Sequence, residues 1–310
     1  MSAAIPGIHH ITAICGAPQT NLKFYNGLLH QRLVKKTVNF DDPGTYHLYY
    51  GDRAGSPGSI LTFFPFVDAE DGRTGPGMAS AFAYAVPGGE AAFTGLMERF
   101  ADEGLMFDGP AERFGERVVA LDDPDGLRVE FVETHGDGAE AVSHFHSVTL
   151  WLHDFGPTAR VLTDIFGFEA GDEAQEGTFT RQRFTATGGG GIVDLVRSDG
   201  RRYARQGKGT IHHVAFRAES EAVQREWRER LAGAGFDVTP VIDRQYFNAI
   251  YFREPGGVLF EIATDPPGFA VDEPAETMGS ALMLPPQYEG HRREIEAVLP
   301  PLPVPPVPVA

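Results

Sequence analysis

The feature that most constrains the fold of this chain is a strand–helix–strand–strand–strand pattern that recurs along its length. The first copy opens with the alternating segment GIHHITAI at residues 7–14 and continues with a helical pattern over residues 22–29. Strand-like runs follow at residues 32–40, 46–51 and 59–66. A unit this small cannot bury its apolar face alone, so we expect the copies to pack against one another.

Three further copies follow the same order. The second extends from about residue 79 to 133, with a helix near residues 92–101. The third opens at residues 143–152, has its helix at 158–166 and ends at 190–198. The fourth starts with TIHHVAFRA at 210–218, has a helix over 221–234 that Gly235 ends, and closes with GGVLFEIATD at 256–265. The pattern predicts an α+β fold built from four βαβββ modules.

The two halves of the sequence also repeat each other. DPDGLRVEF at residues 123–131 aligns with EPGGVLFEI at 254–262, and HHIT at 9–12 aligns with HSVT at 146–149. This duplication predicts an N-terminal pair of modules at 1–138, a C-terminal pair at 139–268 and an extension at 269–310, with a turn-rich linker at 136–141. Proline dominates the last ten residues of the extension, which predicts a mobile, extended tail.

Three side chains become candidate metal ligands when the copies are compared: His10, His213 and Glu261. Each histidine is the second of a pair that opens the first strand of a module, and Glu261 lies in the last strand of the fourth module. Alternate residues of a strand share a face, so His10 lies with Thr12, and Glu261 lies with Leu259. Two imidazoles and one carboxylate on such faces can meet in one cavity.

The corresponding positions of the other modules lack these ligands. Ala81, Ser147 and Glu130 replace them in the second and third copies, and Phe63 aligns with Glu261 in the first copy. We therefore expect one metal site without a fourth protein ligand, and a second site that is inactive. Two histidines, one carboxylate and open coordination positions are typical of non-haem Fe(II) enzymes that use O₂.

Composition excludes several other classes of protein. The single cysteine, Cys15, excludes a disulfide framework and any site built from several cysteines. The formal net charge of −17 repels phosphate backbones, so we expect no nucleic acid partner. No apolar run is long enough for a transmembrane helix, and the first residues lack the regions of a signal peptide. We therefore expect a cytoplasmic protein without a membrane partner.

Several segments are specific in combination: IHHIT at 8–12, IHHVAF at 211–216, DRQYFNAIYFREPGGVLFE at 243–261, YHLYYGD, RFGERVVALDDPDG and PPQYEGHRREIE. Together they resemble the vicinal oxygen chelate superfamily of glyoxalases, bleomycin resistance proteins and extradiol dioxygenases. The chain is most similar to its two-domain ring-cleaving dioxygenases of the hydroquinone 1,2-dioxygenase type. The resemblance covers residues 5 to about 298 and implies two curved-sheet domains. It also implies iron binding by His10, His213 and Glu261, with the site between modules one and four.

The resemblance further implies a group of catalytic residues near the metal. It transfers to His9, Thr12, His212, Arg244 and Tyr251. A guanidinium and a phenol that face the cavity can donate hydrogen bonds to a phenolate or superoxide oxygen and stabilise its charge. Regular strand alternation, by contrast, turns His9 and His212 away from their neighbours, which favours a role in orienting the ligands.

These observations predict an Fe²⁺-dependent dioxygenase that inserts O₂ into a small aromatic substrate of the hydroquinone type. Two other activities stay open, those of a catechol extradiol dioxygenase and of a glyoxalase-type metal-dependent isomerase. The isomerase normally needs a fourth protein ligand, and the aligned Phe63 cannot supply one. A non-enzymatic protein that sequesters an aromatic compound is a further alternative. Mn, Zn and Ni are other candidates for the ion in isolated protein, and a homo-oligomer stays open.

Overall fold

The computed structural model describes residues 4–136, 142, 144–198 and 203–304, and its elements follow the predicted order. Module one contains β1 (Ile8–Cys15), α1 (Pro18–Leu22) continued by the π-helical turn η1 (Lys23–Leu28), β2 (Arg32–Asn39), β3 (Asp42–Gly51) and β4 (Ile60–Pro65). Module two contains β5 (Met78–Val86), α2 (Gly89–Asp102), β6 (Asp108–Arg113), β7 (Glu116–Asp122) and β8 (Arg128–Glu133).

The second half of the chain repeats this arrangement. Module three contains β9 (Phe145–Trp151), α3 (Gly156–Arg160) continued by the π-helical turn η2 (Val161–Ile165), β10 (Glu169–Glu176), β11 (Phe179–Thr185) and β12 (Ile192–Ser198). Module four contains β13 (Thr210–Ala218), α4 (Glu221–Gly233), β14 (Ile242–Asp243), β15 (Phe247–Arg253) and β16 (Leu259–Pro267).

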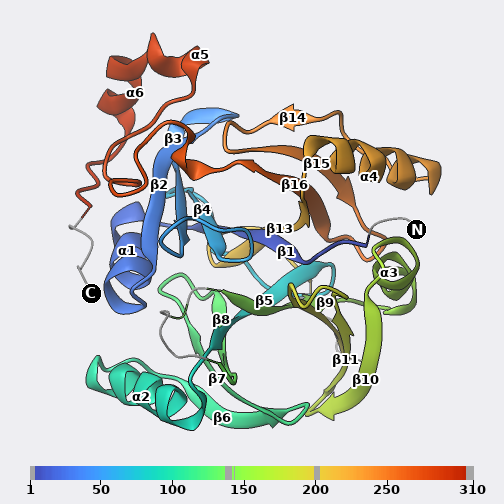
Figure 1. Cartoon of the computed structure of the whole chain (residues 1–310). Helices are drawn as coiled ribbons and strands as arrows, with labels where there is room; N and C mark the ends of the chain where they lie inside the picture. The colour runs from blue at the N-terminus through green and yellow to red at the C-terminus, as the bar shows by residue number, and fades with distance from the viewer. Residues whose placement is uncertain (1–3, 137–141, 143, 199–202, 305–310) are drawn as a thin grey trace.

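The modules form two eight-stranded sheets that curl, with helices α1–α4 on their outer sides (Figure 1). The first sheet has the strand order β14-β15-β16-β13-β1-β4-β3-β2, and the second has the order β10-β11-β12-β9-β5-β8-β7-β6. Antiparallel pairing of β1 with β13 joins modules one and four, and that of β5 with β9 joins modules two and three. The predicted α+β fold of βαβββ modules is confirmed, and each sheet takes one module from either half of the chain.

Aromatic side chains fill the space between the helices and the sheets. The ring of Tyr25 in η1 lies 4.7 Å from that of Phe63 in β4. Phe166, directly after η2, lies 5.0 Å from Phe216 of β13 and 5.7 Å from Trp227 of α4. Because the helices cover one face of each sheet, the opposite face is left for other contacts. None of the described helices is long and apolar enough to cross a membrane.

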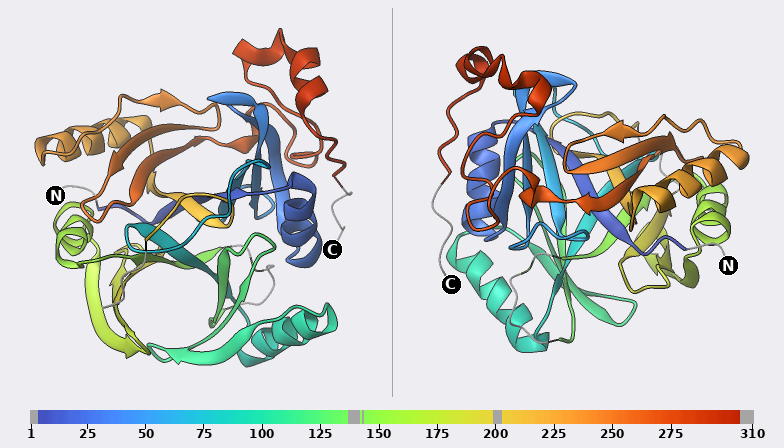
Figure 2. Two further views of the ribbon diagram at one scale, coloured as in Figure 1. Left: turned by 180° about the vertical axis from the view of Figure 1, so that it is seen from behind. Right: turned by 45° about the horizontal axis from the view of Figure 1, so that its top comes forward.

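The extension that follows β16 packs along module one (Figures 1 and 2). It contains η3 (Phe269–Val271), α5 (Pro286–Glu289) and α6 (Arg292–Val298). Leu282 forms a β-bridge with Lys36 of β2, and Leu302 is buried in the core. Within the predicted mobile tail, Leu302 thus packs against an apolar surface, and the mobility of the tail stays a prediction. Residues 305–310 and the predicted linker residues 137–141 lie outside the described residues.

Candidate metal centre

The two predicted histidine ligands lie on neighbouring strands at the centre of the first sheet. In the antiparallel β1–β13 pair, Thr12 is opposite His213 and His10 is opposite Ala215. In the parallel β13–β16 pair, Ala215 is opposite Glu261. Ala215 is therefore the common neighbour of His10 and Glu261, and His213 precedes it by two residues on the same face. Strand register brings the three predicted ligands together.

The polar atoms of these three side chains converge on one point. Nε2 of His10 lies 3.2 Å from Nε2 of His213, and Oε2 of Glu261 lies 3.4 and 2.9 Å from these two nitrogens. The three residues are only 1%, 5% and 0% exposed. Among the described residues, they are the one group of histidine, cysteine and acidic side chains close enough to hold a metal ion.

Glu261 provides a test of whether a cation fits this site. Neither carboxylate oxygen receives a hydrogen bond of acceptable geometry from any described residue, although both imidazoles are close. Burial alone would raise the pKa of this carboxyl, but its interactions with His10 and His213 hold the pKa well below its usual value. An ionised carboxylate buried without donors is unfavourable, and a divalent cation would offset that cost. Two nitrogens and one carboxylate oxygen therefore fit a metal ion.

Two β-bulges place His9 and His212 beside these residues. Ile8 and His10 pair with two consecutive residues of β13, so His9, which lies between them, is an extra residue without a pairing partner on that strand. In the same way, His212 of β13 has no pairing partner on β1. Nδ1 of His9 lies 2.9 Å from Nδ1 of His10, and the two Nδ1 atoms of His212 and His213 lie 2.8 Å apart. The prediction that His9 and His212 turn away is wrong, because a bulge redirects its side chains.

These contacts leave Nε2 of His10 and His213 available for a metal ion. An imidazole that coordinates through Nε2 carries its proton on Nδ1 and donates it to the neighbouring ring. Burial, together with the electrostatic interaction with the adjacent histidine, lowers the pKa of His9 and of His212 to about 3. Both rings are therefore neutral at neutral pH and can accept this hydrogen bond. His9 also forms a hydrogen bond with the backbone of Thr264.

Arg244 and Tyr251 come from β15 and the turn that precedes it. Tyr251 is opposite Glu261 in the β15–β16 pair, and its ring lies 5.8 Å from that of His213. Nε of Arg244 donates to the Tyr251 hydroxyl at 3.3 Å, and Nη1 lies 3.1 Å from the carboxylate of Asp41. Burial and the nearby carboxylate of Glu261 raise the pKa of Tyr251 well above its usual value, so the phenol stays protonated.

A cavity of about 270 Å³ connects these groups. Its walls are largely aromatic and apolar, with polar groups at the candidate metal site: His10, Thr12, Asn39, Phe40, Asp41, His47, Tyr49, Phe64, Phe66, His212, His213, Arg244, Phe247, Tyr251, Leu259 and Glu261. A dry cavity of roughly 150 Å³ is enough to hold benzene, so this one has room for a substituted ring. His9 is the one proposed catalytic residue that does not line it.

The residue of module one that corresponds to Glu261, and that would supply a fourth ligand, is Thr62 and not Phe63. Thr12 is opposite Thr62 in the β1–β4 pair, just as Ala215 is opposite Glu261 in the β13–β16 pair. Phe63 points to the other face, where it packs beneath the helix of module one. The sequence alignment was out of register by one residue, and such a slip exchanges the two faces of a strand. The hydroxyl of Thr62 donates to Thr12 Oγ1 at 2.9 Å.

His47 is a cavity residue that the sequence analysis did not select. Its Nδ1 lies 2.8 Å from the Tyr49 hydroxyl, and its Nε2 lies 2.8 Å from Oγ1 of Thr62. By strand register Tyr49 corresponds to Tyr251 of module four, so two phenols flank the site. The signal in the sequence that points to His47 is its alternation with Tyr49, which places the two side chains on the same face of a strand. No repeat supports it, because module four has an alanine at the position of His47.

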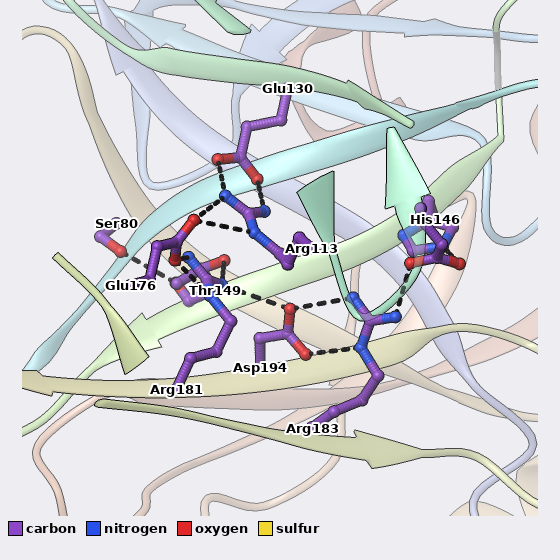
Figure 3. A network of polar contacts seen from close by, with 10 residues as sticks. Ser80, Arg113, Glu130, His146, Thr149, Glu176, Arg181, Arg183 and Asp194 are labelled. Carbon is purple, nitrogen blue, oxygen red and sulfur yellow. Dashed lines mark hydrogen bonds and ion pairs between the residues drawn. The ribbon is translucent and has the colours of Figure 1, made fainter. Parts of the chain in front are cut away.

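The second sheet has the same strand register but a different set of side chains. Ser147 is opposite Ala83, which is opposite Glu130, so Ser147 and Glu130 hold the positions of His10 and Glu261. The carboxylate of Glu130 accepts two hydrogen bonds from Arg113, at 2.6 and 2.9 Å (Figure 3). A guanidinium therefore neutralises this carboxylate.

Two further arginines extend this network of ion pairs. Nη1 of Arg181 lies 3.2 Å from Asp194 and donates to Thr149 at 3.0 Å, while Nε of Arg183 lies 3.0 Å from Asp194 (Figure 3). Asp194 is opposite Thr149 and thus corresponds to Thr62 of the first sheet. Glu130 and Asp194 are therefore both paired with arginine side chains.

Comparison with known proteins gives a consistent set of matches. A sequence model of the Glyoxalase/Bleomycin resistance protein/Dioxygenase superfamily matches residues 7–131 and 144–262. "Putative ring-cleaving dioxygenase MhqO" of Bacillus subtilis (strain 168) is 47% identical over 315 residues, which cover 98% of this chain and 99% of that protein. "Chlorohydroquinone/hydroquinone 1,2-dioxygenase" of Sphingobium indicum is 31% identical over 309 residues, with 94% and 95% of the two chains covered.

Solved structures agree with these matches. A crystal structure of a "putative dioxygenase" from Bacillus subtilis has a TM-score of 0.90 and 46% identity, and the match covers 98% of this chain and 99% of that one. Glyoxalase I from Zea mays has a TM-score of 0.63 at 15% identity, with 84% and 92% of the two chains covered. The second match is a likeness of fold alone.

Proposed function

Because this chain belongs to the glyoxalase/bleomycin resistance protein/dioxygenase superfamily, we propose that it is an Fe(II)-dependent ring-cleaving dioxygenase for hydroquinone-type rings. The observation that carries the proposal is the convergence of His10, His213 and Glu261 beside a cavity with aromatic walls. The names of the relatives support the reaction class and the substrate class.

His10, His213 and Glu261 are the residues that would hold the ion. When bound, Fe(II) supplies the electron transfer between an electron-rich phenolate and O₂ that ring cleavage needs. His9 and His212 keep the two ligand rings in the orientation that directs Nε2 toward the ion. Because Nδ1 of His212 accepts from His213, its proton is on Nε2, from which it can donate to an oxygen in the cavity.

Arg244 and Tyr251 provide hydrogen bonds to negative charge in the cavity. The Tyr251 oxygen accepts from Arg244, and its own proton faces Glu261 in the cavity, from where it can donate to a substrate oxygen. The interactions of Arg244 with Tyr251 and Asp41 outweigh its burial and raise its pKa, so its charge is permanent. Such donors stabilise an oxygen that gains negative charge during the reaction more than they stabilise a neutral one.

The isomerase alternative is less compatible with this site. A glyoxalase-type isomerase normally uses a fourth protein ligand. Thr62 is at the corresponding position, and its hydroxyl is hydrogen-bonded to Thr12 and His47. Three protein ligands leave open positions for a substrate oxygen and O₂. The dioxygenase proposal uses these positions.

The proposal is tested by oxygen consumption after anaerobic reconstitution with Fe(II). The substrates are hydroquinone, methylhydroquinone and catechol, and the products are examined by mass spectrometry. His10→Ala and Glu261→Gln each remove one proposed ligand and should abolish oxygen uptake. Glu130→Gln is the matched control, because it changes the register-equivalent carboxylate of the second sheet and should leave uptake intact below its unfolding temperature.

The expected result is oxygen uptake with the para-diphenols and a ring-opened product that contains both atoms of O₂. Preference for catechol would reassign the substrate within the same reaction class. Absence of uptake with every aromatic compound, at full iron loading, would overturn the dioxygenase proposal. Isomerisation of a hemithioacetal under these conditions would assign the isomerase instead.

A further inference from the structure

The C-terminal extension lies outside the four modules, yet it reaches the turn that carries Arg244. We propose that Asp272, in this extension, is a positioning residue that holds Arg244 in place at the cavity. The inference rests on the proposed function only in that Arg244 acts on the substrate. The contacts of Asp272, the backbone of the turn and the anchoring of the extension each support it.

The carboxylate of Asp272 connects the extension to two separate parts of the first sheet. Oδ1 accepts from Nζ of Lys35 in β2 at 2.6 Å. Oδ2 accepts from Nε2 of Gln245 and from the hydroxyl of Tyr246, both at 2.9 Å. Gln245 and Tyr246 directly follow Arg244. One carboxylate therefore holds the two residues next to the guanidinium-bearing residue.

The backbone of this turn needs support from outside. Gln245 has a φ of +65°, in the left-handed region that residues with a side chain rarely adopt. Within the turn, Tyr246 N donates to Arg244 O at 2.7 Å and Arg244 N donates to Phe247 O at 2.9 Å. The two side-chain bonds to Asp272 add restraint to this strained backbone.

Asp272 is itself held by contacts of the extension with residues outside the turn. Lys35 is fully buried, and its Nζ also lies 2.6 Å from Glu273. The ring of Phe269 lies 5.1 Å from that of Tyr49 in β3, which is outside the turn. Farther along the extension, Tyr288 donates to the Phe40 carbonyl at 2.8 Å. Because the extension is anchored independently, Asp272 can restrain the turn.

Arg244 is a side chain for which such restraint matters. Its Nη1 contacts the exposed Asp41 at the rim of the cavity, whereas its Nε contacts the buried Tyr251 hydroxyl. A shift of the turn would change the balance between these two contacts and the direction of the guanidinium. Loss of the Asp272 contacts is therefore expected to weaken hydrogen bonding by Arg244 to a cavity oxygen.

The experiment compares Asp272→Ala with Glu273→Ala in the full-length protein. Each variant removes one carboxylate that lies 2.6 Å from Lys35, so both leave this buried ammonium with one partner fewer. Asp272 contacts the turn, whereas Glu273 contacts the backbone of Gly279. Hydrogen–deuterium exchange of residues 242–253 should accelerate several-fold in Asp272→Ala and stay unchanged in Glu273→Ala. Tyr246→Phe, which spares the Lys35 pair, is the second variant if Asp272→Ala fails to fold.

A kinetic cycle with Arg244→Ala separates positioning from general destabilisation. Asp272→Ala should lower kcat/KM about ten-fold when Arg244 is present and leave it unchanged when Arg244 is absent. Equal losses in both backgrounds, or equal exchange in Asp272→Ala and Glu273→Ala, would overturn the proposal. If the unmodified protein consumes no oxygen with any aromatic compound, the proposed function fails, while the exchange comparison still decides the role of Asp272.

Discussion

Replacement of Arg113 by methionine is expected to destabilise the fold while leaving the candidate metal centre intact. The guanidinium of Arg113 donates to Glu130 at 2.6 and 2.9 Å and to Glu176 at 2.9 Å. The side chains of Arg113 and Glu130 are 11% and 8% exposed, whereas that of Glu176 is 41% exposed. Methionine retains much of the apolar stem of arginine and removes the charge.

The expected decrease in the free energy of unfolding follows from the charges that remain after Arg113 is replaced. The carboxylate of Glu130 stays buried without its partner, and removal of one side of a buried ion pair costs about 3–5 kcal/mol. We expect the lower end, about 3 kcal/mol, because Glu130 keeps slight access to water and Glu176 can turn toward solvent. For a chain of 310 residues the loss corresponds to a Tm lower by roughly 4–5 °C, because the entropy of unfolding grows with chain length.

The assay is denaturant and thermal unfolding of the original protein, Arg113→Met, Glu130→Gln and the double variant. Removal of both charges should leave the double variant more stable than Arg113→Met, because no carboxylate is then left unpaired. A coupling energy below about 0.5 kcal/mol would refute the reasoning, since it would mean that the two side chains act independently. Iron content after reconstitution should equal that of the original protein.

Three other outcomes are expected. Glu261→Gln should lower iron content measured by mass spectrometry, whereas Glu130→Gln should not, and equal losses would contradict a single site. His9→Ala should weaken metal affinity about 10–100-fold in a chelator competition, because His10 loses the acceptor that orients it; unchanged affinity would argue against this role. Burial raises the pKa of Asp123 to about 6 from an ordinary 3.8, so its contribution to stability is complete below pH 3.8 and is lost as the pH rises through 6. The resulting decrease in the free energy of unfolding is about 3 kcal/mol between pH 4 and 7, and it should be absent in Asp123→Asn. If the stability of this variant depends on pH as that of the original protein does, Asp123 is not the group responsible.

Much of the fold could be predicted because the same pattern occurs in each module. Repetition makes a weak strand signal informative, and comparison of equivalent positions selected His10, His213 and Glu261 out of many polar residues. The same comparison failed for Phe63, because an alignment without strand pairing does not determine which residue faces the cavity. His47 was missed for a related reason, since no repeat marks it.

The sequence by itself determined the βαβββ modules, their number and the residue types at the candidate site, since these depend on local periodicity and on comparison within the chain. Only the tertiary structure decided that His9 and His212 contact the neighbouring rings, because β-bulges arise from the pairing of strands far apart in the chain. The contact between Asp272 and the turn after Arg244 likewise depends on where the extension packs. Such contacts are set by the joint geometry of several segments, which no single stretch of sequence encodes.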